Sequence, residues 1–338
     1  MDNSTSPSTI RDSSDPALND WAAFRRQYAL SITEDELYSY TRTWSLDGRF
    51  AYPPHRPVAS VRYGGPEVQA EGDMQRLAYD WITSHRQQNP ECNIFIPEVY
   101  KIFTENNGTY LMTEYIPPDP LPGRGPCPAC GHDEFPRRVY IEMVDDAVKL
   151  LARIPAPEGA GPGPWSSIAG GAKVRIRHPA FDVDDEAAVV YRSVAELEDH
   201  FNKALAKRWE QKQKRRVPVR EEEEEEEEEK APTVSFRDEP LVFCYAGYGQ
   251  DNFVFKMQPD WKTHGLWIVD FGYASFLPLS FVAFGMVEGR YFPRLPVEEL
   301  DESLPGDNLA AMQEVSYCLK VMGSRFGLPV EEGRERKR

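Results

Sequence analysis

The spacing of apolar and polar residues in the first third of the chain predicts a small group of strands and one long helix. Apolar side chains, among them Met74 and Trp81, recur near one face of a stretch that begins at residue 67. Two later apolar runs flank the turn Glu105–Asn106–Asn107–Gly108, which is typical of a β-hairpin. The pattern therefore predicts, in order, a helix over residues 20–31, a strand over 58–63, a helix over 67–84 and a hairpin of 99–103 with 110–116.

The rest of the chain combines amphipathic helices with two strand–loop–strand segments. Apolar residues at helical spacing predict helices over residues 137–154 and 194–213, the second preceded by a capping box of Ser193 and Glu196. Between residues 241 and 278, apolar strands enter and leave two loops. Asp270 follows four apolar residues, the position at which a buried strand delivers a carboxylate to a cleft.

A charged, low-complexity block over residues 207–232 interrupts this region without ending the fold. Basic residues 212–216 lead into nine consecutive glutamates at 221–229. Because strand signals resume directly afterwards, we interpret the block as a solvated insertion. Nuclear targeting through the basic cluster and an electrostatic contact surface are the alternatives. Residues 1–18 and 331–338 are predicted to be disordered tails.

Charge and composition exclude several classes of partner and location. The net charge of −16 disfavours nucleic acid and anionic membrane, although the poly-glutamate run supplies nine of the negative charges. The first residues lack the pattern of a secretory signal, and no apolar run approaches the ~20 residues of a membrane span. Five cysteines in 338 residues do not suggest a disulfide framework. We therefore expect a soluble, cytoplasmic protein.

Two possible metal- or proton-binding features receive simpler interpretations. Cys127 and Cys130, followed by His132, look like half of a zinc site. Zinc takes four ligands, and the sequence offers no second pair, so no zinc is expected. His178, which precedes Pro179, is expected in a surface loop.

The two loops after residue 241 carry the side chains with the clearest chemistry. Phosphoryl transfer needs a carboxylate that orients the acceptor hydroxyl and hard oxygen ligands that hold Mg²⁺ against the phosphates. A carboxamide and a carboxylate from adjacent strand ends can meet at one ion, and Asn252 and Asp270 are such a pair. The alternatives are a loop-stabilising amide for Asn252 and a turn-capping carboxylate for Asp270.

These residues resemble the catalytic segment of the aminoglycoside phosphotransferase and choline kinase-like branch of the protein-kinase-like fold. That family carries His-x-Asp-x-x-x-x-Asn in its catalytic loop and a strand that ends in Asp-Phe or Asp-Trp for the metal. Counting back from Asn252, Tyr245 stands in place of the histidine and Gly247 in place of the catalytic aspartate. Asp270 with Phe271 matches the second motif, so the resemblance implies Asn252 and Asp270 as Mg²⁺ ligands.

The resemblance extends over roughly residues 58–286 with the family's order of elements. Arg62 stands where the family has the lysine that contacts the nucleotide phosphates. Glu71, with Glu67 as a second candidate, fits the helix glutamate that pairs with it. The hinge strand, which offers backbone groups to the adenine of ATP, is implied at Glu114, Tyr115 and Ile116.

The departures from the family pattern concern the acceptor more than the metal. Gly247 cannot accept a proton or orient a hydroxyl, and Asp251 is a weak substitute because it adjoins Asn252 and points elsewhere unless the loop is remodelled. Arg62 keeps the positive charge of the lysine but carries a larger, planar group. Replacing Gly247 by aspartate is expected to restore transfer if the rest of the site is intact.

The resemblance implies an α+β, two-lobed protein-kinase-like fold, with a small antiparallel-sheet lobe over residues 19–116 and a larger, mainly helical lobe over 117–330. Three functions are compatible with this sequence. The first is a protein with weakened or lost phosphotransferase activity that binds ATP and Mg²⁺. The second is an active kinase for an unknown small-molecule acceptor, with a non-standard catalytic loop. The third is an interaction protein that binds a protein partner through the charged insertion, without a nucleotide.

Overall fold

The computed structural model describes residues 16–44, 48–117, 134–167, 174–215, 230–257, 264–288 and 308–329. The predictions for residues 1–15, for the cysteine motif, for the poly-glutamate run and for the C-terminal tail lie outside these residues. Helix α1 (Pro16–Ser31) begins three residues inside the predicted N-terminal tail.

The chain divides into two compact units, one made of Met1–Gly65 and Glu98–Ile116 and the other of Pro66–Pro97 and Pro117–Arg338. These are not the two continuous segments predicted from the sequence. The difference is helix α3 (Pro66–Gln88), which was expected in the small lobe and belongs to the second unit. Its buried residues Met74 and Ala78 join the large hydrophobic core of that unit, which explains the grouping.

The first unit is built on an antiparallel sheet with the strand order β1-β2-β5-β4. The predicted hairpin is present, and Glu105 pairs with Gly108 across a two-residue turn. Both turn residues have positive φ, 49° at Asn106 and 66° at Asn107, which asparagine tolerates and which suits the twist of the strands. The strands of this sheet are β1 (Arg49–Tyr52), β2 (Ala59–Gly64), β4 (Val99–Glu105) and β5 (Gly108–Glu114).

Two elements of the first unit escaped the sequence analysis, β1 and helix α2 (Glu34–Trp44). Helix α2 has few apolar residues, and Leu37 is its fully buried member in the small core with Ala29 and Ile32. A signal for its start was present, because the Thr33 hydroxyl accepts a hydrogen bond from the Glu36 N–H at 3.2 Å, as an N-cap does.

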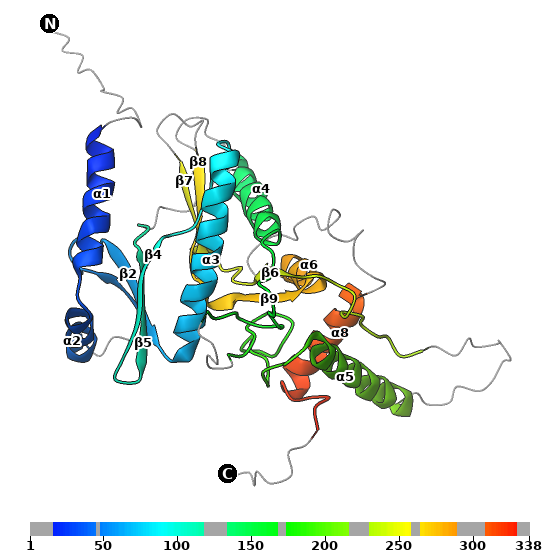
Figure 1. Ribbon diagram of the computed structural model, residues 1–338. Coiled ribbons are helices and arrows are strands. Elements are labelled where there is room, and N and C mark those ends of the chain that lie inside the picture. The colour runs from blue at the N-terminus through cyan, green and yellow to red at the C-terminus, as the bar shows by residue number, and fades with distance from the viewer. Residues whose placement is uncertain are drawn as a thin grey trace, which may run out of the picture. The chain divides into compact units, whose positions relative to one another are not determined.

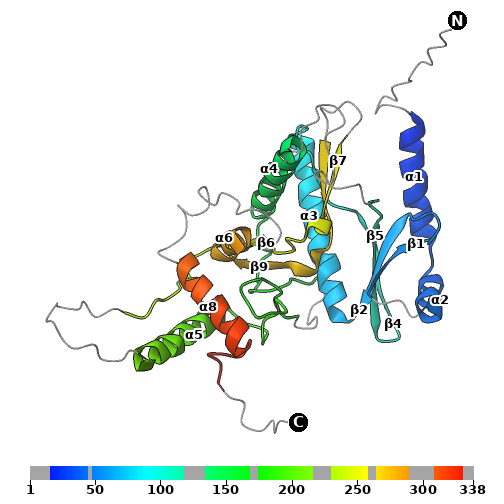
Figure 2. The same cartoon turned by 180° about the vertical axis from the view of Figure 1, so that it is seen from behind.

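The second unit contains two small sheets besides helix α3 (Figures 1 and 2). Both predicted strand–loop–strand segments are present, as β6–β7 and β8–β9. Because β6 pairs with β9 and β7 pairs with β8, the two intervening loops are brought together. One sheet holds β3 (Ile94–Phe95), β8 (His264–Ile268) and β7 (Phe253–Met257), and the other holds β6 (Leu241–Tyr245) and β9 (Ala274–Pro278).

Helices make up most of the remainder of the second unit. The α+β class predicted from the sequence is therefore confirmed, with an antiparallel-sheet unit and a mainly helical unit. Helices α5 and α8 lie side by side in both views, and Arg208 pairs with Glu314 at 3.1 Å between them (Figures 1 and 2). No helix in the described part of the chain has both the length and the apolar character to cross a membrane. These helices are α4 (Glu134–Leu151), α5 (Val194–Arg215), α6 (Leu279–Glu288) and α8 (Asn308–Met322).

A buried carboxylate, Glu239, joins the starts of α6 and α8. One oxygen accepts a hydrogen bond from the Ser280 N–H at 2.7 Å, and the other accepts from the Ser280 hydroxyl and from the Asn308 amide, the latter at 2.7 Å. The amide of Asn308 also exchanges two hydrogen bonds of 3.0 Å with the backbone of Ser235. The chain that follows the charged insertion is thereby fixed to the core of the unit.

Candidate functional site

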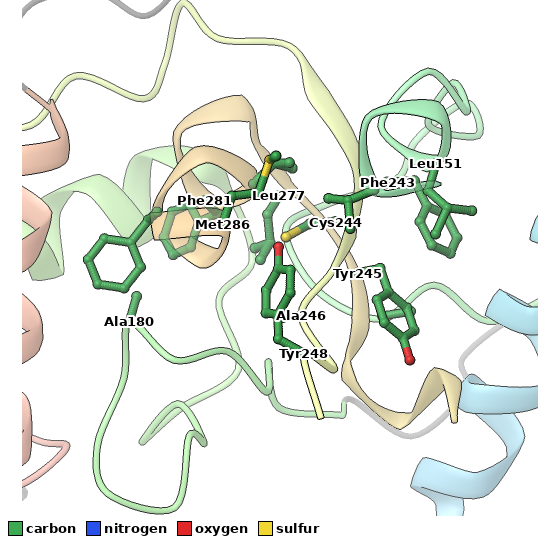
Figure 3. Close-up of a cluster of buried hydrophobic side chains, with 14 of the residues drawn as sticks. Leu151, Ala180, Phe243, Cys244, Tyr245, Ala246, Tyr248, Leu277, Phe281 and Met286 are labelled. Atoms are coloured by element: carbon green, nitrogen blue, oxygen red, sulfur yellow. The ribbon is translucent and has the colours of Figure 1, made fainter. Parts of the chain in front are cut away.

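Tyr245 fixes the loop that carries the degenerate motif. Its ring is 1% exposed and packs edge-on against Phe253 and Phe271, with centroid distances of 5.6 and 5.4 Å. Its hydroxyl donates to the Val269 carbonyl at 2.6 Å, one residue before Asp270. Figure 3 shows Tyr245 and Tyr248 leaving the same loop in different directions, Tyr248 into the apolar cluster beside Cys244. Tyr245 therefore links the loop after β6 to the loop after β8.

Asn252 forms a second link between the same two loops. Its main-chain carbonyl accepts a hydrogen bond from the Val269 N–H at 2.9 Å, and its side-chain amide nitrogen donates to the Gly247 carbonyl at 3.1 Å. This use of the nitrogen turns the side-chain oxygen away from Gly247. An amide oxygen is the atom of asparagine that can ligate Mg²⁺. The loop-stabilising role and the ligand role, considered as alternatives from the sequence, are thus compatible.

Asp270 adopts a left-handed backbone conformation, with φ 65° and ψ 75°. Such a conformation is uncommon for a residue with a side chain, and it is found often at functional turns. One carboxylate oxygen accepts from the Gly272 N–H at 3.4 Å, a long hydrogen bond that caps the following turn. The capping alternative is therefore part of the structure. This cap is a weak hydrogen bond that involves one carboxylate oxygen of Asp270.

A cavity of about 530 Å³ opens beside this loop within the second unit. Gly247 and Asn252 contribute to its lining, together with Tyr273 and an acidic turn over residues 183–186. Neither this turn nor Arg177, which also lines the cavity, was predicted from the sequence. The run of four carboxylates between residues 182 and 186 was a visible signal. Only the tertiary structure brings these carboxylates next to the position that lacks one.

The acidic turn is anchored by His178, which was expected at the surface and is completely buried. Its Nδ1 accepts a hydrogen bond from the Ala180 N–H at 3.0 Å, so Nε2 carries the proton and donates to the Phe281 carbonyl at 2.9 Å. Burial lowers the pKa of this imidazole to about 3. The surface-loop prediction was wrong because the sequence does not reveal which loop packs under α6.

Arg177 and Tyr273 form a fixed pair at the edge of the cavity. The guanidinium carbon lies 4.0 Å from the centroid of the Tyr273 ring, and a guanidinium nitrogen donates to the phenol oxygen at 2.7 Å. The cation–π contact and the hydrogen bond hold the positive charge of Arg177 in one place. The cavity therefore presents one fixed cation beside three carboxylates of residues 184–186.

Asp251 is not part of the cavity lining. Its side chain is exposed, and its charge acts on Tyr140 of α4, whose pKa is raised mainly by burial and secondarily by this carboxylate. Asp251, the weak candidate for the missing base, therefore lies outside the cavity that Gly247 lines, and its role stays a prediction.

The other predicted nucleotide contacts lie on both units. Arg62 lies in β2 of the first unit, opposite Leu111, whereas Glu71 is buried in α3 of the second unit, with 4% of its surface exposed. Their pairing stays a prediction. Glu67, the second candidate for that pair, is exposed in the first turn of α3.

The predicted hinge residues end the sheet of the first unit. The N–H groups of Glu114 and Tyr115 donate to the carbonyls of Glu98 and Val58 at 2.8 and 3.3 Å, and the Tyr115 carbonyl accepts from Arg25 at 2.9 Å. Ile116 follows β5 and is half-buried. Adenine recognition by Glu114, Tyr115 and Ile116 stays a prediction.

No group of three or more His, Cys, Asp or Glu side chains in the described residues is arranged to hold a metal ion. A Mg²⁺ site of the phosphoryl-transfer kind needs fewer protein ligands, because the nucleotide phosphates and water complete the coordination. The amide oxygen of Asn252 and the carboxylate of Asp270 are oxygen donors of the kind that Mg²⁺ takes, and their role as its ligands stays a prediction.

Comparison with known proteins gives similarity of fold and none of sequence. No protein-family model matches the chain, and no curated protein is similar to it. Among solved structures, it is similar to a putative fructosamine-3-kinase from Haemophilus somnus, with 11% identity over 76% of this chain and 73% of that chain and a TM-score of 0.35. It is also similar to an aminoglycoside phosphotransferase from Streptomyces rimosus, solved with ADP and streptomycin, with 13% identity, 85% and 99% coverage and a TM-score of 0.37.

A third similar structure is the GDP and kanamycin complex of APH(2")-IIia, with 11% identity, 81% and 80% coverage and a TM-score of 0.39. These are the kinds of protein that the motifs in the sequence resemble. Every TM-score is below 0.5, so these structures assign no function to this chain.

Proposed function

We propose that this chain is a kinase-like nucleotide-binding protein that holds ATP with Mg²⁺ and has weakened or lost phosphotransferase activity. Asn252 and Asp270 would supply the two protein ligands for the metal, which would neutralise charge on the phosphates. Gly247 supplies no group that could orient an acceptor hydroxyl. The proposal thus separates two abilities, binding of the nucleotide with its metal and handling of the acceptor proton.

The observation that carries this proposal is the way Asn252 and Asp270 are held. The Val269–Asn252 backbone bond of 2.9 Å places the asparagine beside the residue that precedes Asp270. Asp270 is held in a left-handed conformation that costs energy on the order of 1 kcal/mol or more and is retained only where the surrounding structure imposes it. A chain that had lost every use for this turn would have no need of either feature.

Thermal-shift titration with ATP, with and without Mg²⁺, tests the proposal. We expect wild-type protein to be stabilised by ATP with Mg²⁺ more than by ATP alone, and Asp270→Asn to lose the magnesium-dependent part. Asparagine is preferred to alanine here because it tolerates the left-handed backbone, so the change removes charge without adding strain. Asp251→Asn is the matched control, since this exposed carboxylate of the neighbouring loop after β6 should keep the full response. Equal shifts with and without Mg²⁺ in the wild type would contradict the proposal.

One observation favours a second function, an active small-molecule kinase with a relocated carboxylate. Asp184 and Asp185 line the same cavity as Gly247, so either could orient an acceptor there. ATP turnover that depends on an added acceptor and is abolished by Asp184→Asn or Asp185→Asn, but not by Glu158→Gln at an exposed site, would establish this alternative. The first proposal expects no acceptor-dependent turnover.

Location and further partners belong to the proposal as well. We propose a cytoplasmic protein whose ligands are a nucleotide and, if it is active, a small-molecule acceptor. Nuclear targeting through residues 212–216 would have to compete with an ion pair, because Lys212 contacts Glu314 at 2.8 Å. A protein partner bound through the charged insertion stays a separate hypothesis.

A further inference from the structure

Gly247 has no room for a side chain. A Cβ atom built on its backbone would lie 2.9 Å from the Tyr245 hydroxyl, 3.1 Å from the Tyr245 Cζ and 3.1 Å from the Asn252 amide nitrogen. Real Cβ atoms essentially never lie within 3.0 Å of another heavy atom, so a side chain here would require the Tyr245 hydroxyl to shift. Gly247 does not have the positive φ that would itself require glycine. The demand for glycine at this position therefore comes from its neighbours, chiefly from one tyrosine.

Tyr245 cannot move aside at low cost. Phe253 and Phe271 hold its ring from two sides, and the ring is 1% exposed. Its hydroxyl is also held, by the 2.6 Å bond to the Val269 carbonyl. A rotated ring would leave that carbonyl without its phenol donor and would open a void in a close-packed cluster. The clash at Gly247 is thus with a fixed group, although the hydroxyl is the far end of a side chain.

We propose that Tyr245 and Gly247 form a coupled pair, in which the phenol group of Tyr245 takes the space that a side chain at residue 247 would need. Tyr245 then acts as a positioning residue that ties the loop to the Asp270 turn and excludes a carboxylate from the acceptor position. The functional meaning of the pair rests on the proposed function, whereas the coupling itself does not. Tyr245 in place of the histidine and Gly247 in place of the aspartate are then linked by one steric cause.

A double-mutant cycle on stability tests the coupling. Gly247→Ala should lower the thermal midpoint of the wild-type protein, and this drop should shrink by roughly half or more in a Tyr245→Phe background, where the closest contact is gone. In a Tyr245→His background the shorter ring removes both tyrosine contacts, so the drop should be smaller still. If the two residues act independently, Gly247→Ala will lower the thermal midpoint equally in the wild-type, Tyr245→Phe and Tyr245→His proteins. That result would overturn the proposal.

Gly249→Ala is the matched control for this cycle. A Cβ at residue 249 would meet the Asn252 amide nitrogen at 3.5 Å, an ordinary contact, and would meet no atom of Tyr245. We expect Gly249→Ala to lower the thermal midpoint slightly and by the same amount in every background. A smaller effect of Gly249→Ala in the Tyr245→Phe background would also overturn the proposal. If the Tyr245 variants do not fold, the comparison in the wild-type background still decides, because Gly247→Ala must cost clearly more than Gly249→Ala.

The cycle is independent of nucleotide binding. Absence of any response to ATP and Mg²⁺ would remove the proposed function and leave the measured coupling as it stands. Additive stability effects would remove the coupling and leave the nucleotide response as it stands. The two failures are therefore distinguishable in one set of purified proteins.

Discussion

At the scale of single residues, the loop after β6 shows how two substitutions can depend on one another. Tyr245 uses its hydroxyl to hold the Val269 carbonyl at 2.6 Å, and the same oxygen would lie only 2.9 Å from a Cβ at residue 247. The sequence alone predicts that Gly247 stands in place of a carboxylate and that one substitution restores it. In the folded chain, the carboxylate has no space until the tyrosine is changed.

Gly247→Asp by itself should therefore fail as a gain-of-function change. We expect it to destabilise the protein by about 1–3 kcal/mol through overpacking, with no gain in ATP turnover. The double variant with Tyr245→His and Gly247→Asp should recover part of the lost stability. Its ATP turnover should be higher than that of the Gly247→Asp single variant. Urea unfolding and coupled ATP hydrolysis measure both quantities. Higher turnover in Gly247→Asp than in the double variant would contradict this account.

At the scale of secondary-structure elements, the second unit depends on polar contacts that fix helix starts. Glu239 joins the first residues of α6 and α8, and Glu198 of α5 accepts hydrogen bonds from the Phe236 and Arg237 N–H groups at 2.7 and 3.0 Å. These contacts lie on the stretch that follows the charged insertion. They fix residues 236–239 to α5, α6 and α8.

Glu239→Ala should be among the more costly substitutions away from the cavity. The change removes the acceptor of the buried Ser280 N–H and one acceptor of the Asn308 amide, so we expect a loss of roughly 2–4 kcal/mol. Glu239→Gln should cost less, because it keeps one acceptor oxygen. Glu210→Ala on the exposed side of α5 is the control and should stay within about 0.5 kcal/mol of wild type. Equal effects of the Glu239→Ala and Glu210→Ala changes in urea unfolding would refute the capping role.

At the scale of the whole molecule, buried histidines make stability depend on pH. Burial lowers the pKa of His178 from its ordinary value of 6.5 to about 3 and also lowers that of His200. Below about pH 6.5 these histidines bind protons in the unfolded chain but not in the folded one. The free energy of unfolding is therefore highest above that pH and decreases as the pH falls. Glu239 acts in the opposite sense, because burial raises its pKa.

Between pH 7.5 and 5.5, His178 alone should reduce the free energy of unfolding by about 1.4 kcal/mol. His178→Gln, which can still donate to the Phe281 carbonyl, should lower stability at pH 7.5 and should remove this part of the pH dependence. Urea unfolding of both proteins at the two pH values provides the measurement. An identical pH dependence in wild type and variant would show that the buried imidazole is not responsible.

The sequence by itself determined the elements that local pattern encodes. The helix that became α3, the hairpin at Asn106 and Asn107, and the strands on either side of Asn252 and Asp270 were all readable, because periodicity and turn chemistry act over a few residues. The motif spacing also pointed to Asn252 and Asp270 as a pair. Helix α2 was missed because its apolar stripe is short.

Only the tertiary structure decided what surrounds that pair. It grouped α3 with the second unit, buried His178 beneath α6, and brought the acidic turn at residues 183–186 beside Gly247. It also placed the Tyr245 hydroxyl 2.9 Å from the position that a Cβ at residue 247 would take. These relations depend on packing between distant parts of the chain, and even the close approach of Tyr245 to Gly247 is set by the contacts of Tyr245 with Val269 and Phe271. Local pattern carries no information about such contacts.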